Sequence, residues 1–410
     1  MATYQRGDKK IYGMTIPENM KSTNLKPERK NAWEVGLDWR FFDSRIGVDL
    51  TYYKENTRNQ IMTINVPWES GVKEKLINAG NIQNSGIEIA LNTTPIKKKQ
   101  WQWDLNFTYT RNRNKIVELS PDVTSYINLD GAANYGNYRI ASVAKVGSDY
   151  GMLMSDSWIK TDEKTGKPVV GYTNKFRTVY YKRGGTVKEV GSMLPNFLGS
   201  LNSTLRWKDL SLYVLFDARF GGYVASYNSR YATAYGFSGE TEKYRKGMTW
   251  TSKYANAQDK VFTDGFIPDV VFDAGTIVTT PGGTNQDVSG MTYQEAYEKG
   301  YVEPAHLQSA AYFKNSWGTG VINDDWFKKI NYIALREITL SYNVPTKISS
   351  YIGAKNLSLS FTGRNLAYLL NTAPNHENPE SVRGTGAAQF RMRSFMPYTA
   401  SYLFTLNATF

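Results

Sequence analysis

The stretch WQWDLNFTYTRNRN, residues 101–114, decides what kind of fold this chain can have. Apolar and polar side chains alternate along it, which is the period of two expected for a β-strand with one apolar face. The apolar side carries Trp101, Trp103, Leu105, Phe107 and Tyr109, and the polar side carries Gln102, Asp104, Asn106, Thr108 and Thr110. In a soluble sandwich the apolar face packs into a core, whereas in a barrel set in lipid it faces outward and the polar face lines the lumen.

Composition leaves these two classes open. The chain has 410 residues and a mean hydropathy of −0.48, and no segment approaches the roughly 18 apolar residues of a spanning helix. Alternating strands keep the mean hydropathy of a membrane barrel low, so a low value does not exclude one. The absence of cysteine excludes disulfides, cysteine metal sites and cysteine nucleophiles.

The net charge of +12 comes from 49 basic and 37 acidic residues. Nucleic-acid binding would require clustered basic residues, but the densest run is Lys97 to Lys99, in an expected turn. We therefore predict no nucleic-acid partner. The first 20 residues contain no apolar segment of the kind found in a signal peptide.

Similar alternation recurs along the chain and predicts an all-β fold of about ten long antiparallel strands. The clear segments are 33–41, 46–52, 86–92, 101–110, 198–207, 210–220, 330–343, 356–366 and 399–410, with further candidates at 150–160 and 176–190. In 330–343 the apolar side changes between Leu335 and Ile338, which predicts a β-bulge near Arg336. Strands of about 10 to 13 residues suit a tilted membrane crossing better than a globular sheet.

The connections alternate in length, as they do in outer-membrane barrels with short periplasmic turns and long external loops. Residues 1–31 are expected to form a loop before the first strand, and 32–410 a single barrel region. Short links are expected at 43–45, 95–100, 207–210 and 344–355, and long external loops at 59–83, 114–196, 222–329 and 367–398. Within the third long loop, Tyr293, Ala296 and Tyr297 have helical spacing and predict a short surface helix.

Several of these segments resemble a known family. NLKPERKNAWEVGLDWRFFDSRIGVDLTYYKENTRNQI (24–61) looks like a strand pair of TonB-dependent outer-membrane transporters, and NAGNIQNSGIEIALNTTPI (78–96) resembles the strand that follows it. GSMLPNFLGSLNSTLRWKDLSLYVLFDARFGG (191–222) is similar to a hairpin of the SusC/RagA-like branch. The segments LREITLSYNVP (335–345), LSLSFTGRNLA (357–367) and YTASYLFTLNATF (398–410) complete the series in the expected order.

The resemblance implies an antiparallel transmembrane β-barrel of roughly 22 strands, plugged by an N-terminal domain and located in the outer membrane of a Bacteroides-type Gram-negative cell. It implies a TonB complex that supplies energy through the plug, and a SusD-like surface lipoprotein that captures oligosaccharides or peptides. The sequence lacks the plug and about half of the strands, so it is expected to be the C-terminal half of such a transporter, natural or truncated. The resemblance implies import and no enzymatic activity.

The alternative is a soluble or surface-anchored β-sandwich that binds glycans. A membrane β-barrel would differ from this alternative in two ways: its mobility on a gel would change on heating, and it would need detergent to stay in solution.

The sequence contains no recognisable catalytic motif, and it predicts neither a metal site nor a cofactor. His306 and His376 stand alone in loops, without ligand spacing around them. Asp324 and Asp325 offer far fewer oxygen atoms than the 6 to 8 that Ca²⁺ takes. The candidate ligand contacts are aromatic residues of the loop 222–329, because exposed rings suit sugar rings or peptide side chains: Trp250, Tyr254, Tyr312, Trp317 and Trp326. The alternative for each ring is packing between loops.

The last segment predicts a strand read by the barrel assembly machinery. Tyr402, Phe404, Leu406 and Phe410 lie on one outward face together with Ala408, and the chain stops on the aromatic Phe410. By resemblance, outer-membrane barrels commonly end in this way. The alternative role of Phe410 is simple burial.

Overall fold

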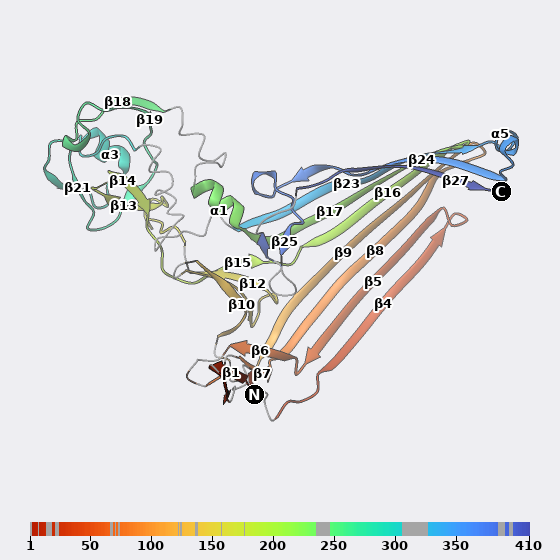
Figure 1. Cartoon of the computed structure of the whole chain (residues 1–410), viewed down its shortest axis with the longest axis horizontal. Coiled ribbons are helices and arrows are strands. Elements are labelled where there is room, and N and C mark those ends of the chain that lie inside the picture. The colour runs from red at the N-terminus through yellow and green to blue at the C-terminus, as the bar shows by residue number, and fades with distance from the viewer. Residues whose placement is uncertain are drawn as a thin grey trace.

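The computed structural model of the chain describes residues 2–6, 8–13, 19–20, 24–65, 69, 71–72, 74–121, 123, 125–135, 138–156, 158–175, 177–234, 247–305, 327–383, 390–392 and 397–410. A curved sheet of long strands extends across most of it, with smaller sheets at one end (Figure 1). Among the described residues, no helix is long and apolar enough to cross a bilayer.

Nine long strands form what we call the wall. Each wall strand is antiparallel to its neighbours. In spatial order they are β27 (Ser401–Thr409), β24 (Asn356–Asn371), β23 (Phe327–Val344), β17 (Leu210–Ser226), β16 (Phe197–Trp207), β9 (Trp101–Leu119), β8 (Gly80–Lys98), β5 (Ile46–Arg58) and β4 (Arg29–Phe41). The short strand β26 (Arg391–Met392) pairs with β17, and β25 (Val382–Arg383) pairs with β26. The wall confirms the predicted barrel sheet; its nine strands curve without closing, and the longest have 19 residues.

Short and long connections alternate between the wall strands. Short links join β4 to β5, β8 to β9, β16 to β17 and β23 to β24, the last through α5 (Thr346–Ser349) and η4 (Ser350–Ile352). The long connections lie at the other end of the wall, which we call the external end (Figure 1).

Two candidate strands were wrongly assigned to the wall. Segments 150–160 and 176–190 contain β12 (Met152–Ser155), β14 (Thr178–Tyr181) and β15 (Lys188–Ser192), which belong to smaller sheets. β9 pairs directly with β16, from Thr110 opposite Leu198 down to Trp101 opposite Trp207, so the wall has no place for an inserted strand. β12 and β15 instead form a four-stranded external sheet with β10 (Tyr126–Tyr135) and β11 (Tyr138–Lys145).

The predicted bulge at Arg336 is present. Leu335 and Glu337 are paired with successive residues of β17, Phe216 and Leu215, so Arg336 is the extra residue. The pairing with β24 is also irregular at this point, where Asn365 and Leu366 lie between the partners of Leu335 and Glu337. The bulge brings Ile333 and Leu335 to the same face as Ile338 and Leu340.

A compact external lobe extends from the wall, built from parts of the second and third long loops (Figure 1). Its core contains Val170, Phe272, Val278, Tyr293 and Ala296. Its elements are β13 (Val169–Thr173), β14, β18 (Met248–Thr251), η2 (Ala255–Ala257), β19 (Val261–Gly265), β20 (Val271–Phe272), β21 (Ile277–Thr279), β22 (Asn285–Asp287) and α3 (Tyr293–Glu298). The helix α3 was predicted correctly, but its Tyr293 and Ala296 are buried in the lobe core.

The remaining short elements lie at the external end. The first 31 residues, expected as a loop, contain the hairpin of β1 (Ala2–Arg6) and β2 (Lys9–Gly13), and β4 already begins at Arg29. β3 (Asn19–Met20) joins β7 (Glu74–Asn78) and β6 (Ile61–Asn65) in a small sheet. The helix α1 (Tyr227–Ala234) follows β17, and η5 (Pro374–His376) follows β24.

Candidate functional site

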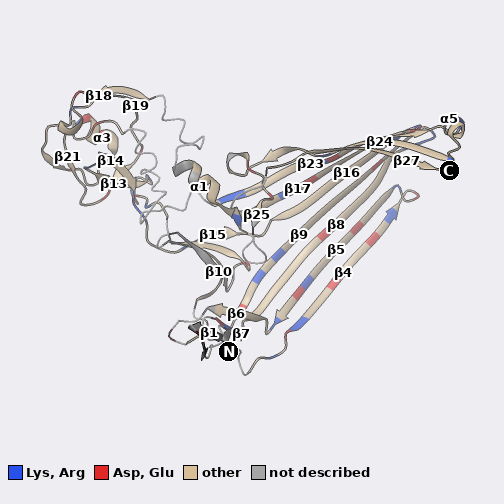
Figure 2. Ribbon diagram, in the orientation of Figure 1, with Lys and Arg blue, Asp and Glu red and all other residues tan. Residues whose placement is uncertain are grey.

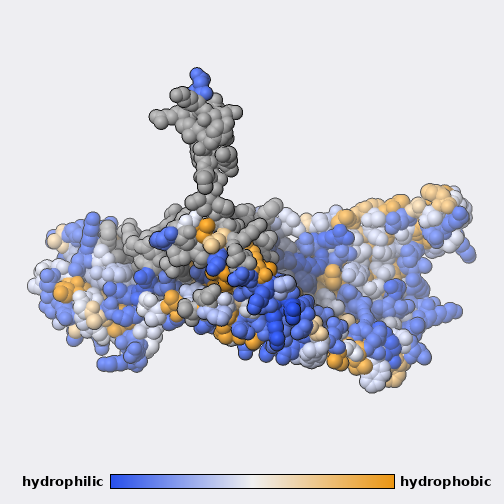
Figure 3. All heavy atoms as spheres, turned by 90° about the horizontal axis from the view of Figure 1, so that it is seen from below, coloured by the Kyte–Doolittle hydropathy of each residue, from blue (hydrophilic) through white to orange (hydrophobic). Residues whose placement is uncertain are grey.

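The two faces of the wall differ in chemistry, and the register keeps that difference across the strands. Leu105, Leu91 and Leu50 lie on one face, because Leu91 is opposite both Phe107 and Val48, and Leu50 is opposite Ile89. This apolar face is exposed, with Phe107 at 40% and Leu340 at 51% of full exposure. From below, polar side chains cover much of the hollow of the wall and apolar ones gather toward its borders (Figure 3). An exposed apolar face opposite a polar one is the arrangement of a lipid-facing barrel wall.

Aromatic side chains mark both borders of the apolar face. Near the short turns, Trp101 and Trp207 stack with their ring centroids 5.6 Å apart. Toward the external end, Phe197 stacks on Phe220 at 4.8 Å and also contacts Tyr109 at 5.3 Å. The strand from Trp101 to Tyr109 measures about 26 Å at ~3.3 Å per residue. At the tilt of about 40° typical of such barrels it spans roughly 20 Å of membrane height, most of the apolar band of about 25 Å. The rings therefore lie where interfacial girdles are expected.

The polar face, which we call the lumenal face, holds cations in ion pairs. Arg206 lies 2.5 Å from Asp104, whose carboxylate also accepts hydrogen bonds from Gln102 and Thr94. Further pairs on this face join Lys30 to Glu55 at 2.5 Å, Arg364 to Glu337 at 2.9 Å, and Arg40 to Asp38 and Asp49. The positive charges of these arginines and of Lys30 are therefore balanced by carboxylates on the same face.

The tightest cluster on the lumenal face forms around the bulge. Arg336 donates to Asp217 at 2.7 Å and to Glu380 at 2.6 Å. Tyr368 donates to Glu380 at 2.9 Å, and Tyr332 lies 3.3 Å from the same residue. Glu380 belongs to the long connection after β24, so this Arg336 cluster holds that connection against the wall. Sequence reasoning located the bulge but missed the cluster, because the spacing does not show which loop carboxylate returns to the wall.

The aromatic candidate Trp250 is held in place by the external lobe. Its ring stacks on Phe262 with centroids 4.7 Å apart, and its indole N–H donates to Glu303 at 3.2 Å. Trp250 is half-buried, so part of its ring surface remains accessible.

The other described candidate of the lobe, Tyr254, is only 6% exposed. Its hydroxyl lies 3.3 Å from that of Tyr172, and the Arg177 guanidinium lies 5.0 Å from the centre of its ring. Burial raises the pKa of Tyr254 above its ordinary value. The hollow between Arg177, Trp250 and Tyr254 measures about 10 Å³, which is room for about one water molecule. Tyr254 is thus placed to support Trp250.

An ion-paired aspartate stabilises the same lobe. Asp273 lies 2.7 Å from Lys160 and 3.4 Å from Lys182. Burial by itself would raise the pKa of the Asp273 carboxyl, but hydrogen bonding and the charges of the two lysines lower it below its usual range.

Several candidates lie outside the described residues: Tyr312, Trp317, Trp326, His306, Asp324 and Asp325. His376 is exposed in η5. Within the described residues, no three His, Asp or Glu side chains are grouped as metal ligands would be.

The outward positions of β27 are strongly exposed, at 66% for Tyr402, 71% for Phe404 and 58% for Leu406. Phe410, just after the strand, is 70% exposed. The ring of Tyr402 stacks on Phe361 of β24 with centroids 6.2 Å apart.

Residues 3–223, more than half of the chain, match the family described as TonB dependent receptor-like, beta-barrel. The chain belongs to this family. TonB-dependent receptor P26 of Formosa agariphila is 23% identical over 363 residues, which cover 86% of this chain and 31% of that receptor. TonB-dependent receptor SusC of Bacteroides thetaiotaomicron is 28% identical over 171 residues, or 41% of this chain and 17% of that receptor.

Solved structures give the same fold. The RagAB peptide transporter has a TM-score of 0.57 at 15% identity, covering 93% of this chain and 35% of the solved chain. The chain therefore spans about a third of the lengths of P26 and of this solved chain. The resemblance to SusC/RagA-like transporters is confirmed, and the wall is that of an outer-membrane β-barrel rather than a soluble β-sandwich.

Proposed function

We propose that this TonB-dependent receptor chain forms part of an active importer that takes up a nutrient such as an oligosaccharide or a peptide. The observation that carries the proposal is the two-faced wall. Its apolar face is bordered by stacked rings, and its lumenal face carries balanced charges. A lumenal face of this kind lets a polar solute pass through weak, hydrated contacts, and no catalytic step is needed.

The proposed partners follow from the family. A SusD-like surface lipoprotein covers the external end and captures the solute, and the TonB complex supplies energy through a plug domain that packs against the lumenal face. The RagAB peptide transporter supports the peptide class, and the oligosaccharide class rests on the resemblance to SusC-like transporters. Trp250 of the external lobe is the proposed solute contact among the described residues. Tyr312, Trp317 and Trp326, which lie outside them, remain proposed contacts from the sequence.

The proposal is tested by measuring the uptake of labelled oligosaccharides and peptides by whole cells. Cells with and without the protein are given a mixture of labelled oligosaccharides and peptides, and loss from the medium is measured before and after the membrane energy is dissipated. We expect one class to be consumed only by cells that contain the protein, and only while they are energised. Equal consumption by both strains, for both classes, would contradict the proposal.

The direction of the wall has a separate test. Gly282 lies in the β21–β22 turn with an ordinary backbone conformation and open space around it, so Gly282→Cys should be tolerated. An impermeant thiol reagent added to whole cells should label this cysteine but not one at Lys98, beside the β8–β9 turn. Labelling at Lys98 in intact cells would reverse the proposed topology.

We propose that the outward face of β27 contacts both lipid and the barrel assembly machinery, through Tyr402, Phe404, Leu406 and Phe410. Phe404→Ser should therefore reduce the amount of protein in the outer membrane more than it lowers the melting temperature in detergent. Leu403→Ser, on the lumenal face of the same strand, is the matched control. If Phe404→Ser lowered only the melting temperature in detergent, the outward face of β27 would contribute apolar burial and no assembly signal.

A further inference from the structure

A row of basic side chains lies on the outward face of the wall, just beyond the external ring of aromatic residues. On β9, Arg111, Arg113 and Lys115 continue the apolar series at alternate positions past Tyr109. The same face of the neighbouring strands carries Lys54 and Arg58 on β5, and Arg29 on β4. We call these six residues the basic row. Basic residues are visible at the ends of β4, β5 and β9 nearest the external loops (Figure 2).

The register places these side chains at several levels along the strands. Lys54 and Arg113 share one level, and Arg29 and Arg58 lie further toward the external end, beyond Lys115. Arg29 is opposite Arg58. Lys54 is opposite Ser85, which is opposite Arg113 on its other side. The row therefore crosses four adjacent strands.

The cations of the basic row form no ion pair with a carboxylate in the described residues. None of its six side chains takes part in a hydrogen bond there either. The outward positions of residues 29–33, 52–58, 83–87 and 109–115 include no Asp or Glu. Like charges side by side repel one another, so an anion from outside the chain would stabilise this surface.

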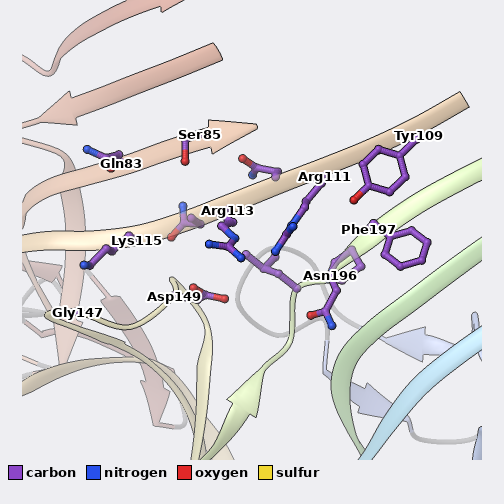
Figure 4. A pocket seen from close by; sticks show the side chains of 14 residues that line it. Gln83, Ser85, Tyr109, Arg111, Arg113, Lys115, Gly147, Asp149, Asn196 and Phe197 are labelled. Carbon is purple, nitrogen blue, oxygen red and sulfur yellow. The ribbon is translucent and has the colours of Figure 1, made fainter. Parts of the chain in front are cut away.

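Part of the row lines a polar pocket of about 910 Å³. The pocket lies beside β9 above Thr110, where its pairing with β16 has ended. Arg111, Arg113 and Lys115 extend from one side of β9, and Asn196 faces them across the pocket (Figure 4). Asp149 is the one acidic side chain among the lining residues.

The level of the pocket identifies its ligand. Tyr109 and Phe197 lie at the base of the pocket. They belong to the group of aromatic residues at the external border of the apolar face, where the lipid–water interface is expected. The cations just beyond them then lie at the level of the lipid headgroups, and clusters of Lys and Arg at that level attract anionic headgroups. We propose that the pocket and the basic row bind the phosphate-bearing headgroup of an outer-leaflet lipid. The proposal rests on the membrane orientation in the proposed function, but not on any transported solute.

The test compares two variants with the same change of charge. In one, Arg111, Arg113 and Lys115 are all replaced by Gln. In the control, Lys97, Lys98 and Lys99 at the opposite end of the wall are all replaced by Gln. The full protein is extracted from outer membranes in mild detergent, and the retained phosphorylated lipid is counted by native mass spectrometry. Heat-modifiable gel mobility first confirms that each variant forms a barrel.

We expect wild type and control to retain lipid equally, and the pocket variant to lose affinity roughly fivefold for each cation removed. In nanodiscs of phosphatidylcholine, added phosphatidylglycerol should raise the melting temperature of wild type and control but not of the pocket variant. Unchanged retention in the pocket variant, or an equal loss in the control, would overturn the proposal. Complete displacement of the lipid by inorganic phosphate would also overturn it, since the site would then recognise a free anion. Loss of solute uptake with lipid retention intact would weaken only the proposed function.

Discussion

The two faces of the wall carry positive charge in opposite ways. On the lumenal face, Arg206 and Arg364 have carboxylate partners on neighbouring strands, and Arg336 has two. On the outward face, Arg113 and its neighbours in the basic row have none among the described residues. The same residue type is thus balanced within the chain on the lumenal face and left without a carboxylate partner among the described residues on the outward face. The presence or absence of ion pairs, more than the number of basic residues, distinguishes the two faces.

The largest expected effect comes from placing a charge on the apolar face. Leu105→Arg should lower the stability of the barrel by about 2–4 kcal/mol, because the new guanidinium would lie in the lipid near the middle of the strand. Asn106→Arg, one residue away on the lumenal face, should cost far less. A refolding titration in lipid vesicles measures both. Equal tolerance at the two positions would remove the distinction between the faces.

A smaller effect is expected when a balanced cation is removed. Arg336→Met should cost about 2 kcal/mol, because Asp217 and Glu380 lose hydrogen bonds between charged groups. Arg113→Met on the outward face should change the stability in detergent by less than about 0.5 kcal/mol, as expected for an exposed, unpaired side chain. Thermal melting of both variants checks the contrast, and a similar loss at Arg113 would show that the basic row has a protein partner.

The smallest effect concerns pH in the external lobe. The lowered pKa of Asp273 means that its ion pairs stabilise the lobe fully above pH ~3.9, the ordinary pKa of the unfolded residue. This contribution is lost as the pH falls through the lower folded-state pKa. We expect about 0.5–1 kcal/mol from these partly exposed pairs. The melting temperature of the Asp273→Asn variant, followed by tryptophan fluorescence, should fall less at acid pH than that of the wild type. An unchanged pH dependence would show that other carboxyl groups cause the loss of stability in acid.

The wall could be predicted from the sequence because each of its strands repeats one rule. Alternation at Trp101 to Tyr109 fixes which side chains share a face, and the change of side around Arg336 revealed the bulge. Residues 150–160 and 176–190 were misassigned because a short strand in an external sheet alternates just as a wall strand does. Only the direct pairing of Thr110 with Leu198 excludes them from the wall.

The candidate sites could be predicted less well, because they depend on contacts between distant segments. Composition suggested Trp250 and Tyr254 alike, yet Tyr172 and Arg177 bury one ring while the other stays half-exposed. Glu380 reaches Arg336 from a different connection. The basic row was visible as Arg111, Arg113 and Lys115 at alternate positions, but its meaning required the aromatic border beside it.

The extra residue at Arg336 makes β23 unequally sensitive to the loss of a single codon. Removing Arg336 itself would restore an uninterrupted ladder with β17 and leave Leu335 and Ile338 on successive outward sites, at the cost of the Arg336 cluster. Removing Thr339 instead would turn every residue on one side of the gap to the opposite face. If the residues after the gap turn, Leu340 and Tyr342 enter the lumen and Ser341 and Asn343 enter lipid; if the residues before it turn, Ile338 enters the lumen and Glu337 enters lipid. Reading-frame-preserving deletions along this strand should therefore survive selection at the bulge and be eliminated beside it.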